Sequence, residues 1–527
     1  MVRLRSVFLG VAVLAAAVGP ARAQVSDSVR AAVHRIFGTA DFASERFGPA
    51  AFIEGGRAYT TVEPSTAVRG GYDIARYETA TGARSVLVSA AAMIPAGQSM
   101  PLDFDDYSWS TDGTKLLLFT NTQRVWRQNT RGDYWVLTLA THKLQKIGGK
   151  APASSLMYAK FSPDGGRVAY VSRGDLYVQR LADGAVTRLT TGATATLVNG
   201  MTDWVYEEEF DLRDGFRWSP DGTKIAYWQF DMSGVGTFDL VNYTDSLYPI
   251  ITPIQYPKAG TTNSAVRIGV ISATGGATTW LKIPGDPRNN YLPWMEWAGQ
   301  RELLIQHMNR LQNTNTVVLA NVTTGALRTP FVDRDSAWVD LVEDVQWTSD
   351  GRRFLFTSER DGWRHVYSIS RDGKDVEPVT NGPFDVVSVA GVDAKGGWLY
   401  YIASPENATQ RYLYRARLDG SGTPERLTPG DQPGTHRYTL SPDWPDECYI
   451  NHSFTPNGLW HLGFVFALAE LPAGSEITVD YRHLLPPGQA EDFVDSVTGE
   501  TITGLSWQES LASSTHALAE LLAATHC

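Results

Sequence analysis

The most regular feature of this chain is a recurring pattern of apolar and polar positions. An aromatic or other apolar residue precedes Ser or Thr and Asp-Gly, and an alternating run follows, as in "FRWSPDGTKIAYWQ". A period of two is typical of a half-buried strand, and Asp-Gly supplies the positive φ that a tight hairpin turn needs. The pattern predicts β-hairpins whose leading aromatic packs between neighbouring sheets. Complete or weakened forms occur at Trp109, Phe161, Trp218, Trp297, Trp347, Val392 and Leu440.

The spacing of these repeats predicts the fold class. Successive positions lie 52, 57, 79, 50, 45 and 48 residues apart. A period of about 50 residues, with four short strands in each unit, is the signature of propeller blades. With an early hairpin in "YDIARYETATGARSVLV", the chain is predicted to be all-β, a seven- or eight-bladed β-propeller. The long step predicts an insertion after Trp218, around "NYTDSLYPIITPIQYPKAGTT".

The two ends of the chain differ from the repeats. Residues 1–23 combine Arg3 and Arg5, an apolar core and the small-x-small site Ala21-Arg22-Ala23, which predicts a secretory signal peptide. We therefore expect a periplasmic or secreted protein with no membrane span after signal removal. The propeller is expected over 24–443, because the pattern stops there. The tail, 444–527, ends in a sequence with helical leucine spacing.

Composition narrows the range of partners. The formal net charge of -11 argues against a phosphate-binding surface, so no nucleic acid is expected. Two cysteines in 527 residues exclude a disulfide framework for the body of the chain. We expect neither a metal nor a cofactor. The sequence leaves the oligomeric state open.

The segment "TDWVYEEEF" places three glutamates, 207–209, behind Trp204 and Tyr206. One interpretation is structural, because a charge run is usually solvated and one or two of these residues can cap a helix N-terminus. The flanking aromatics favour a second interpretation, in which the carboxylates are held in place. Two adjacent fixed carboxylates form a site for an ammonium ion, which has three donors.

"DWVYEEEF" resembles the double-glutamate motif of the dipeptidyl peptidase IV family, in the prolyl oligopeptidase clan of serine peptidases. The resemblance implies that Glu208 and Glu209 clamp the free α-amine of a peptide. The segment "RVWRQNTRGDYWVL" resembles the one that carries an arginine for a substrate backbone carbonyl, which implies that role for Arg127. The implied partners are peptides with a free N-terminus. The resemblance covers about 25–443 and implies eight blades.

The resemblance does not extend to the catalytic machinery. Family members carry a C-terminal α/β-hydrolase domain with the catalytic Ser, Asp and His. The Gly-x-Ser-x-Gly of a nucleophile elbow does not occur in this sequence. The family reaction, release of dipeptides with Pro or Ala commonly second, is therefore not expected from this chain alone. A relative of serine-type dipeptidyl peptidases and a non-catalytic peptide-binding propeller both stay open, and so does the question of enzyme activity.

The tail resembles the C-terminal half of a SET domain, the fold of many protein lysine methyltransferases. The similar phrases are Asn451-His452-Ser453 with Pro456-Asn457, and "LPAGSEITVDY" ending at Tyr481. The resemblance implies S-adenosylmethionine contacts at Asn451 and His452 and a catalytic role for Tyr481. The alternative is purely structural: His452 is a buried histidine and Tyr481 an aromatic residue of a strand. A partial α+β SET-like domain over 444–527 is thus the expectation, and a methyltransferase remnant is a third functional possibility.

Overall fold

The computed structural model describes residues 26–39, 41, 50–343, 345–430 and 434, followed by short pieces of the tail. Contacts divide the chain into two units, 1–50 and 51–527. The described part of the first unit is mainly helix α2 (Asp27–Gly38). Ser26 caps it, because the Ser26 Oγ accepts a hydrogen bond from the Val29 backbone N–H at 3.3 Å. No residue of this helix is buried.

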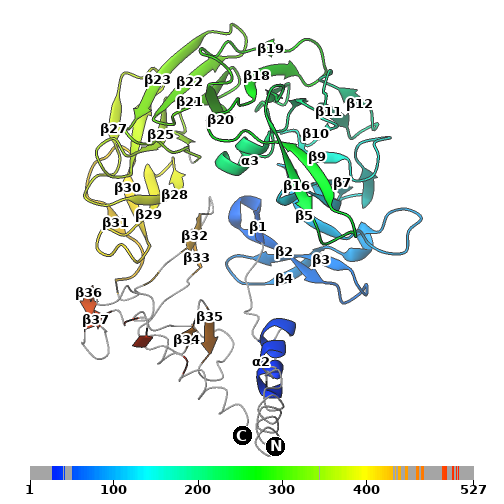
Figure 1. Ribbon diagram of the computed structural model, residues 1–527, viewed down its shortest axis with the longest axis horizontal. Coiled ribbons are helices and arrows are strands. Elements are labelled where there is room, and N and C mark those ends of the chain that lie inside the picture. Colours follow the sequence, from blue (N-terminus) through cyan, green and yellow to red (C-terminus); the bar gives the residue numbers. More distant parts are fainter. Residues whose placement is uncertain are drawn as a thin grey trace, which may run out of the picture. The chain divides into compact units, whose positions relative to one another are not determined.

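The second unit consists of antiparallel sheets that follow one another along the chain (Figure 1). Sheet 1 holds β1 (Ala50–Ile53), β2 (Ala58–Pro64), β3 (Tyr72–Glu78) and β4 (Arg84–Val88), with short 3₁₀ turns at Glu54–Gly56 and Ala90–Met93. Sheet 2 holds β5 (Phe104–Trp109), β6 (Lys115–Val125), β7 (Gln128–Thr138) and β8 (Lys143–Lys146). Sheet 3 holds β9 (Leu156–Phe161), β10 (Arg167–Ser172), β11 (Asp175–Arg180) and β12 (Val186–Arg188). Strands β7 and β9 also pair with each other, which joins sheets 2 and 3.

Sheet 4 is irregular. It holds β13 (Leu197–Asn199), β14 (Phe216–Trp218), β15 (Lys224–Asp231), β18 (Ala265–Ser272) and β19 (Thr279–Trp280). Both β13 and β14 pair with β15, so they are two halves of one edge strand. The chain between these halves carries helix α3 (Trp204–Phe210). A separate hairpin, β16 (Thr237–Asn242) with β17 (Ile250–Gln255), is inserted between β15 and β18.

Three further sheets complete the series. Sheet 5 holds β20 (Asn290–Trp297), β21 (Glu302–Asn309), β22 (Thr314–Asn321) and β23 (Leu327–Arg334). Sheet 6 holds β24 (Gln346–Trp347), β25 (Arg353–Ser358), β26 (His365–Ser370) and β27 (Val376–Pro378). Sheet 7 holds β28 (Val386–Asp393), β29 (Trp398–Ala403), β30 (Tyr412–Arg417) and β31 (Glu425–Arg426). The tail pieces are the pairs β32–β33 (Arg437–Leu440, Pro445–Cys448), β34–β35 (Gly458–His461, Phe464–Ala467) and β36–β37 (Ala490–Val494, Thr501–Thr503).

The recurring Asp-Gly phrase forms the same hairpin turn each time. In the turn of sheet 4, the Ser219 Oγ donates to the Asp221 carboxylate at 2.7 Å, and the Gly222 N–H donates to the Ser219 carbonyl at 2.8 Å. Gly222 has a φ of 64°, a conformation that favours glycine. Only the glycine takes positive φ; the aspartate instead accepts local hydrogen bonds, which lower the pKa of Asp221 to about 2.

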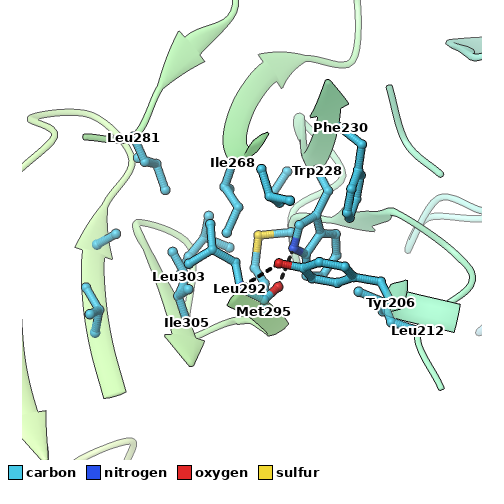
Figure 2. Packing of buried hydrophobic residues seen from close by; sticks show 14 of the residues in the cluster. Tyr206, Leu212, Trp228, Phe230, Ile268, Leu281, Leu292, Met295, Leu303 and Ile305 are labelled. Carbon is cyan, nitrogen blue, oxygen red and sulfur yellow. Dashed lines mark hydrogen bonds between the residues drawn. The ribbon is translucent and has the colours of Figure 1, made fainter. Parts of the chain in front are cut away.

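Side chains that alternate along each strand pack against opposite neighbours. Ile225 and Tyr227 of β15 belong to the hydrophobic cluster shared with sheet 3, whereas Trp228 belongs to the one shared with sheet 5 (Figure 2). Six such clusters join the seven described sheets in chain order. The apolar residue of each of the first six repeats lies in or against the matching cluster: Trp109, Phe161, Trp218, Trp297, Trp347 and Val392.

This architecture confirms the all-β prediction, the packing of the repeat aromatics and the insertion after Trp218. Within the described residues, seven four- or five-stranded sheets correspond to seven predicted blades. Leu440 ends β32, which pairs with β33 after the seventh sheet. The side chains of both strands, the signal peptide and the predicted C-terminal leucine helix lie outside the described residues, so the boundary at 443 stays a prediction.

Candidate functional site

The segment that carries helix α3 leaves and re-enters sheet 4 at two backbone positions, Gly200 and Gly215, that lie very close together. The Gly200 N–H donates to the Trp228 carbonyl at 2.9 Å, and the Trp228 N–H donates to the Gly215 carbonyl at 3.0 Å. The Gly215 N–H also donates to the Gly200 carbonyl at 3.0 Å. A Cβ on Gly215 would lie 2.5 Å from the Gly200 carbonyl carbon, so the two strand halves approach too closely for a side chain. The segment 201–214 is therefore held at both ends by one strand, β15.

Both ends of α3 are capped. The Asp203 Oδ1 accepts a hydrogen bond from the Tyr206 N–H at 3.0 Å, which satisfies a free donor at the N-terminus. The Asp203 Oδ2 accepts one from the Ser264 hydroxyl at 2.6 Å. Burial raises the pKa of Asp203. At the other end Asp211 has a φ of 50°, and the Leu212 N–H donates to the Tyr206 carbonyl at 3.0 Å.

Tyr206 fixes the helix to sheet 5. Its ring is buried against Phe210 and Phe230, at centroid distances of 5.3 and 4.7 Å. Its Oη accepts a hydrogen bond from the Leu292 N–H at 2.8 Å, while the Trp228 Nε1 donates to the Leu292 carbonyl at 2.8 Å (Figure 2). The prediction that the flanking aromatics anchor this segment is confirmed for Tyr206. A seven-residue helix is too short to be stable alone, so these contacts hold it.

The three glutamates have different surroundings, because successive residues of a helix point about 100° apart. The Glu207 side chain is 5% exposed, while Glu208 and Glu209 lie on the exposed side. The Glu208 carboxylate binds Arg127 through two hydrogen bonds of 2.6 Å, from Nε and from Nη2. Among the described residues, Glu209 has no ion-pair or hydrogen-bond partner for its carboxylate. The structure thus brings Arg127 into contact with Glu208, one of the two glutamates of the predicted clamp.

Arg127 reaches α3 from the turn of the β6–β7 hairpin. The preceding residue, Trp126, has a φ of 49° and packs edge-on against Trp204 at 5.7 Å. The Arg127 guanidinium carbon lies 6.0 Å from the centroid of the Trp204 ring. On another side Trp204 contacts Tyr256 at 5.6 Å. The glutamate pair therefore stands beside an aromatic support made of Trp126, Trp204 and Tyr256. Hydrogen bonding to Glu208 raises the pKa of Arg127.

Glu207 is a residue to which the sequence interpretation gave no role of its own, since it assigned the clamp to Glu208 and Glu209. Neither of its carboxylate oxygens has a hydrogen-bond partner among the described residues, and the Arg213 Nε lies 3.9 Å from Oε1. Burial raises the pKa of Glu207, and the charges of Glu208 and Asp211 act in the same direction against that of Arg213. The helical spacing of Glu207 and the buried Phe210 was the available signal, since i and i+3 share a helix face.

The other predicted site residues are not placed. Asn451, His452 and Tyr481 lie outside the described residues, so the SET-like interpretation of the tail stays a prediction. In the part of the chain that the structure describes, no group of three or more His, Cys, Asp or Glu is arranged to hold a metal ion. The same part contains no helix long and apolar enough to cross a membrane.

Fold and site together define a class of protein: a β-propeller with an acidic helix inserted in one blade and paired with an arginine from another. The family model described as "Dipeptidyl peptidase IV (DPP IV) N-terminal region" matches residues 110–455. The chain belongs to this family. The predicted family membership of the propeller is thereby confirmed, whereas none of these findings supports the SET-like interpretation of the tail, which stays a prediction.

Similar proteins support the same assignment. Dipeptidyl peptidase 4 of Felis catus is 30% identical over 339 residues, which are 60% of this chain and 44% of the cat protein. Probable dipeptidyl peptidase 4 of Emericella nidulans is 26% identical over 63% of this chain and 45% of its own. The crystal structure of Porphyromonas gingivalis dipeptidyl peptidase 4 superposes with a TM-score of 0.69 at 25% identity, covering 78% of this chain and 57% of that one. This chain spans a little under half the length of the curated relatives it matches.

Proposed function

We propose that this chain is an exported propeller that recognises the free N-terminus of peptides for a dipeptidyl peptidase. Glu208 and Glu209 bind the α-ammonium group, and Arg127 orients the peptide through a backbone carbonyl. The observation that carries the proposal is the bidentate ion pair between Arg127 and Glu208. The two residues come from different sheets and lie 81 positions apart in the sequence.

The geometry suits an ammonium ion. Its three N–H donors need acceptors, and Glu209 offers a carboxylate with no partner among the described residues. Glu208 is held by Arg127 and so presents its remaining lone pairs in a fixed direction. Each charge-assisted hydrogen bond contributes about 1.5–3 kcal/mol at most when the site is shielded from water. On the open helix we expect millimolar affinity.

Arg127 has a donor left for the peptide. It uses Nε and Nη2 on Glu208, and the described residues provide no hydrogen-bond partner for Nη1. The side chain is 64% exposed, so Nη1 is accessible to a ligand carbonyl. Binding of the ammonium group and of the carbonyl would then depend on the same ion pair.

The proposal is tested by comparing a free tripeptide, Ala-Pro-Ala, with its N-acetylated form by titration calorimetry. The free peptide should bind, and acetylation should abolish binding because it removes the positive charge. Glu208→Gln and Glu209→Gln should each weaken the free peptide about tenfold or more. Glu359→Gln alters an exposed carboxylate in another sheet and serves as the matched control. Equal affinity for the acetylated peptide would exclude the clamp.

A further inference from the structure

A second site is built where sheet 4 meets the connection to sheet 5. A cavity of about 480 Å³, which we call the lateral cavity, is lined by β13, β15, β18, β20 and the segment that leads into β20. This volume falls within the usual range of small-molecule pockets. Its apolar wall includes Leu281 and Leu292, both buried (Figure 2).

The lateral cavity contains a buried acceptor without a donor. Asn290 is 7% exposed, and its Oδ1 has no hydrogen-bond partner among the described residues. The neighbouring Gln229 is already bonded at both ends of its amide, since its Nε2 donates to Asn199 at 2.7 Å and its Oε1 accepts from Arg267 at 2.8 Å. Buried polar groups are normally paired, so an open acceptor in a cavity indicates a missing donor.

Arg267 supplies a positive charge at the same cavity. Two contacts hold the plane of its guanidinium group. The Nε donates to Gln229, and the guanidinium carbon lies 3.7 Å from the centroid of the Trp280 ring. In the described structure its two terminal nitrogens have no ion-pair partner. The nearby Asp231 is paired with Arg288 instead, at 3.1 Å. A guanidinium held in this way is suited to bidentate hydrogen bonding with a carboxylate.

We propose that the lateral cavity binds a small apolar amino acid, free or N-acylated. The carboxylate lies on the terminal nitrogens of Arg267, the α-N–H donates to the Asn290 Oδ1, and the aliphatic side chain packs on Leu281 and Leu292. The cavity presents a cation, a hydrogen-bond acceptor and an apolar wall, so its ligand needs an anion, a hydrogen-bond donor and an apolar group. An α-amino acid has all three within a few bonds. This site is separate from the glutamate pair and does not depend on its function.

The lateral cavity nevertheless adjoins α3. Leu292, in its wall, donates its N–H to the Tyr206 Oη, and Ser264, next to the lining residue Ala265, donates to Asp203. The site therefore shares its supporting bonds with the helix that carries the glutamates.

The experiment uses the full chain and N-acetyl-L-leucine, whose blocked amine keeps it out of an ammonium site. Two matched probes each lack one feature: N-acetyl-L-leucinamide lacks the carboxylate, and 4-methylpentanoate lacks the N–H. We expect saturable binding of N-acetyl-L-leucine in calorimetry, and binding at least about tenfold weaker for either matched probe. Glu208→Gln should leave this binding unchanged, which separates it from the proposed function.

Variants locate the site. Arg267→Met keeps an apolar stem on Trp280 but should lose the preference for the carboxylate, and Leu281→Trp should fill the cavity and abolish binding. Arg352→Met removes an exposed arginine of another sheet and should change nothing. Thermal unfolding of each variant establishes that it is folded, and Arg267→Lys should retain part of the preference. The proposal is overturned if N-acetyl-L-leucinamide binds equally well, if Arg267→Met keeps the carboxylate preference, or if wild type shows no saturation by about 20 mM.

Discussion

Replacing Tyr206 by Phe tests whether one hydroxyl fixes the glutamate helix to sheet 5. The substitution keeps the ring contacts with Phe210 and Phe230 and removes only the acceptor of the Leu292 N–H. Burial raises the pKa of Tyr206 well above its ordinary value, so the hydroxyl is neutral throughout the working pH range. The effect of the substitution should therefore not depend on pH.

The expected magnitude follows from burial. Leu292 is 1% exposed, so its N–H cannot form a replacement hydrogen bond with water when the 2.8 Å bond to Tyr206 is lost. An unsatisfied buried donor costs about 1–3 kcal/mol, and the small space left by one oxygen adds little. The free energy of opening around Leu292 should fall by that amount, which corresponds to roughly 5- to 150-fold faster amide exchange.

Hydrogen exchange of the Leu292 amide is the direct assay, with urea unfolding followed by tryptophan fluorescence as a measure of overall stability. Tyr243→Phe is the matched control, because Tyr243 is 73% exposed at the end of the β16–β17 hairpin. Exchange at Leu292 that stays within about twofold of wild type, in a folded Tyr206→Phe protein, would refute the assigned role of this hydrogen bond. Equal acceleration in the control would do the same.

Three further outcomes follow from the structure. Because burial raises the pKa of Glu207, folding stability should fall as pH rises through the interval between its unfolded and folded pKa, and Glu207→Gln should flatten that fall in urea titrations. Gly215→Ala should lower the urea midpoint strongly, since its Cβ would meet backbone at 200–201, whereas Gly236→Ala meets only an ordinary contact and should change little. Asp221 has its pKa lowered to about 2, so Asp221→Asn should be less stable than wild type at neutral pH and match it as pH falls from about 4 to 2.

The blades could be predicted because their information is local. Each hairpin is specified by a turn phrase within a few residues, and the alternating run beside it sets which side chains face which neighbour. Trp218 and the residues after it illustrate this, since both the strand and its packing in the cluster with sheet 3 follow from the pattern. The insertion was also visible, because the β16–β17 hairpin lengthens one repeat step.

The site could be predicted only in part, because its geometry is not local. Spacing in the sequence contains no information that Arg127 contacts Glu208. The resemblance only implied a role for each residue, and their contact follows from how the sheets pack. The split edge strand of sheet 4 was equally hidden, since its two halves, 197–199 and 216–218, are too short to be recognised as parts of one strand. Asn290 gave no signal, because an orphaned acceptor exists only in three dimensions.

The placement of three adjacent carboxylates also bears on the proposal that α3 binds an ammonium group. Glu207 lies inward near Arg213, which pairs with Asp211 as well, and Glu208 is bound by Arg127. Four carboxylates within one segment, those of residues 207, 208, 209 and 211, thus share two guanidinium groups. Like charges this close repel unless a cation separates them. Part of the unbalanced negative charge lies on the exposed side, at Glu209, where an arriving ammonium ion would be attracted and an anionic ligand repelled.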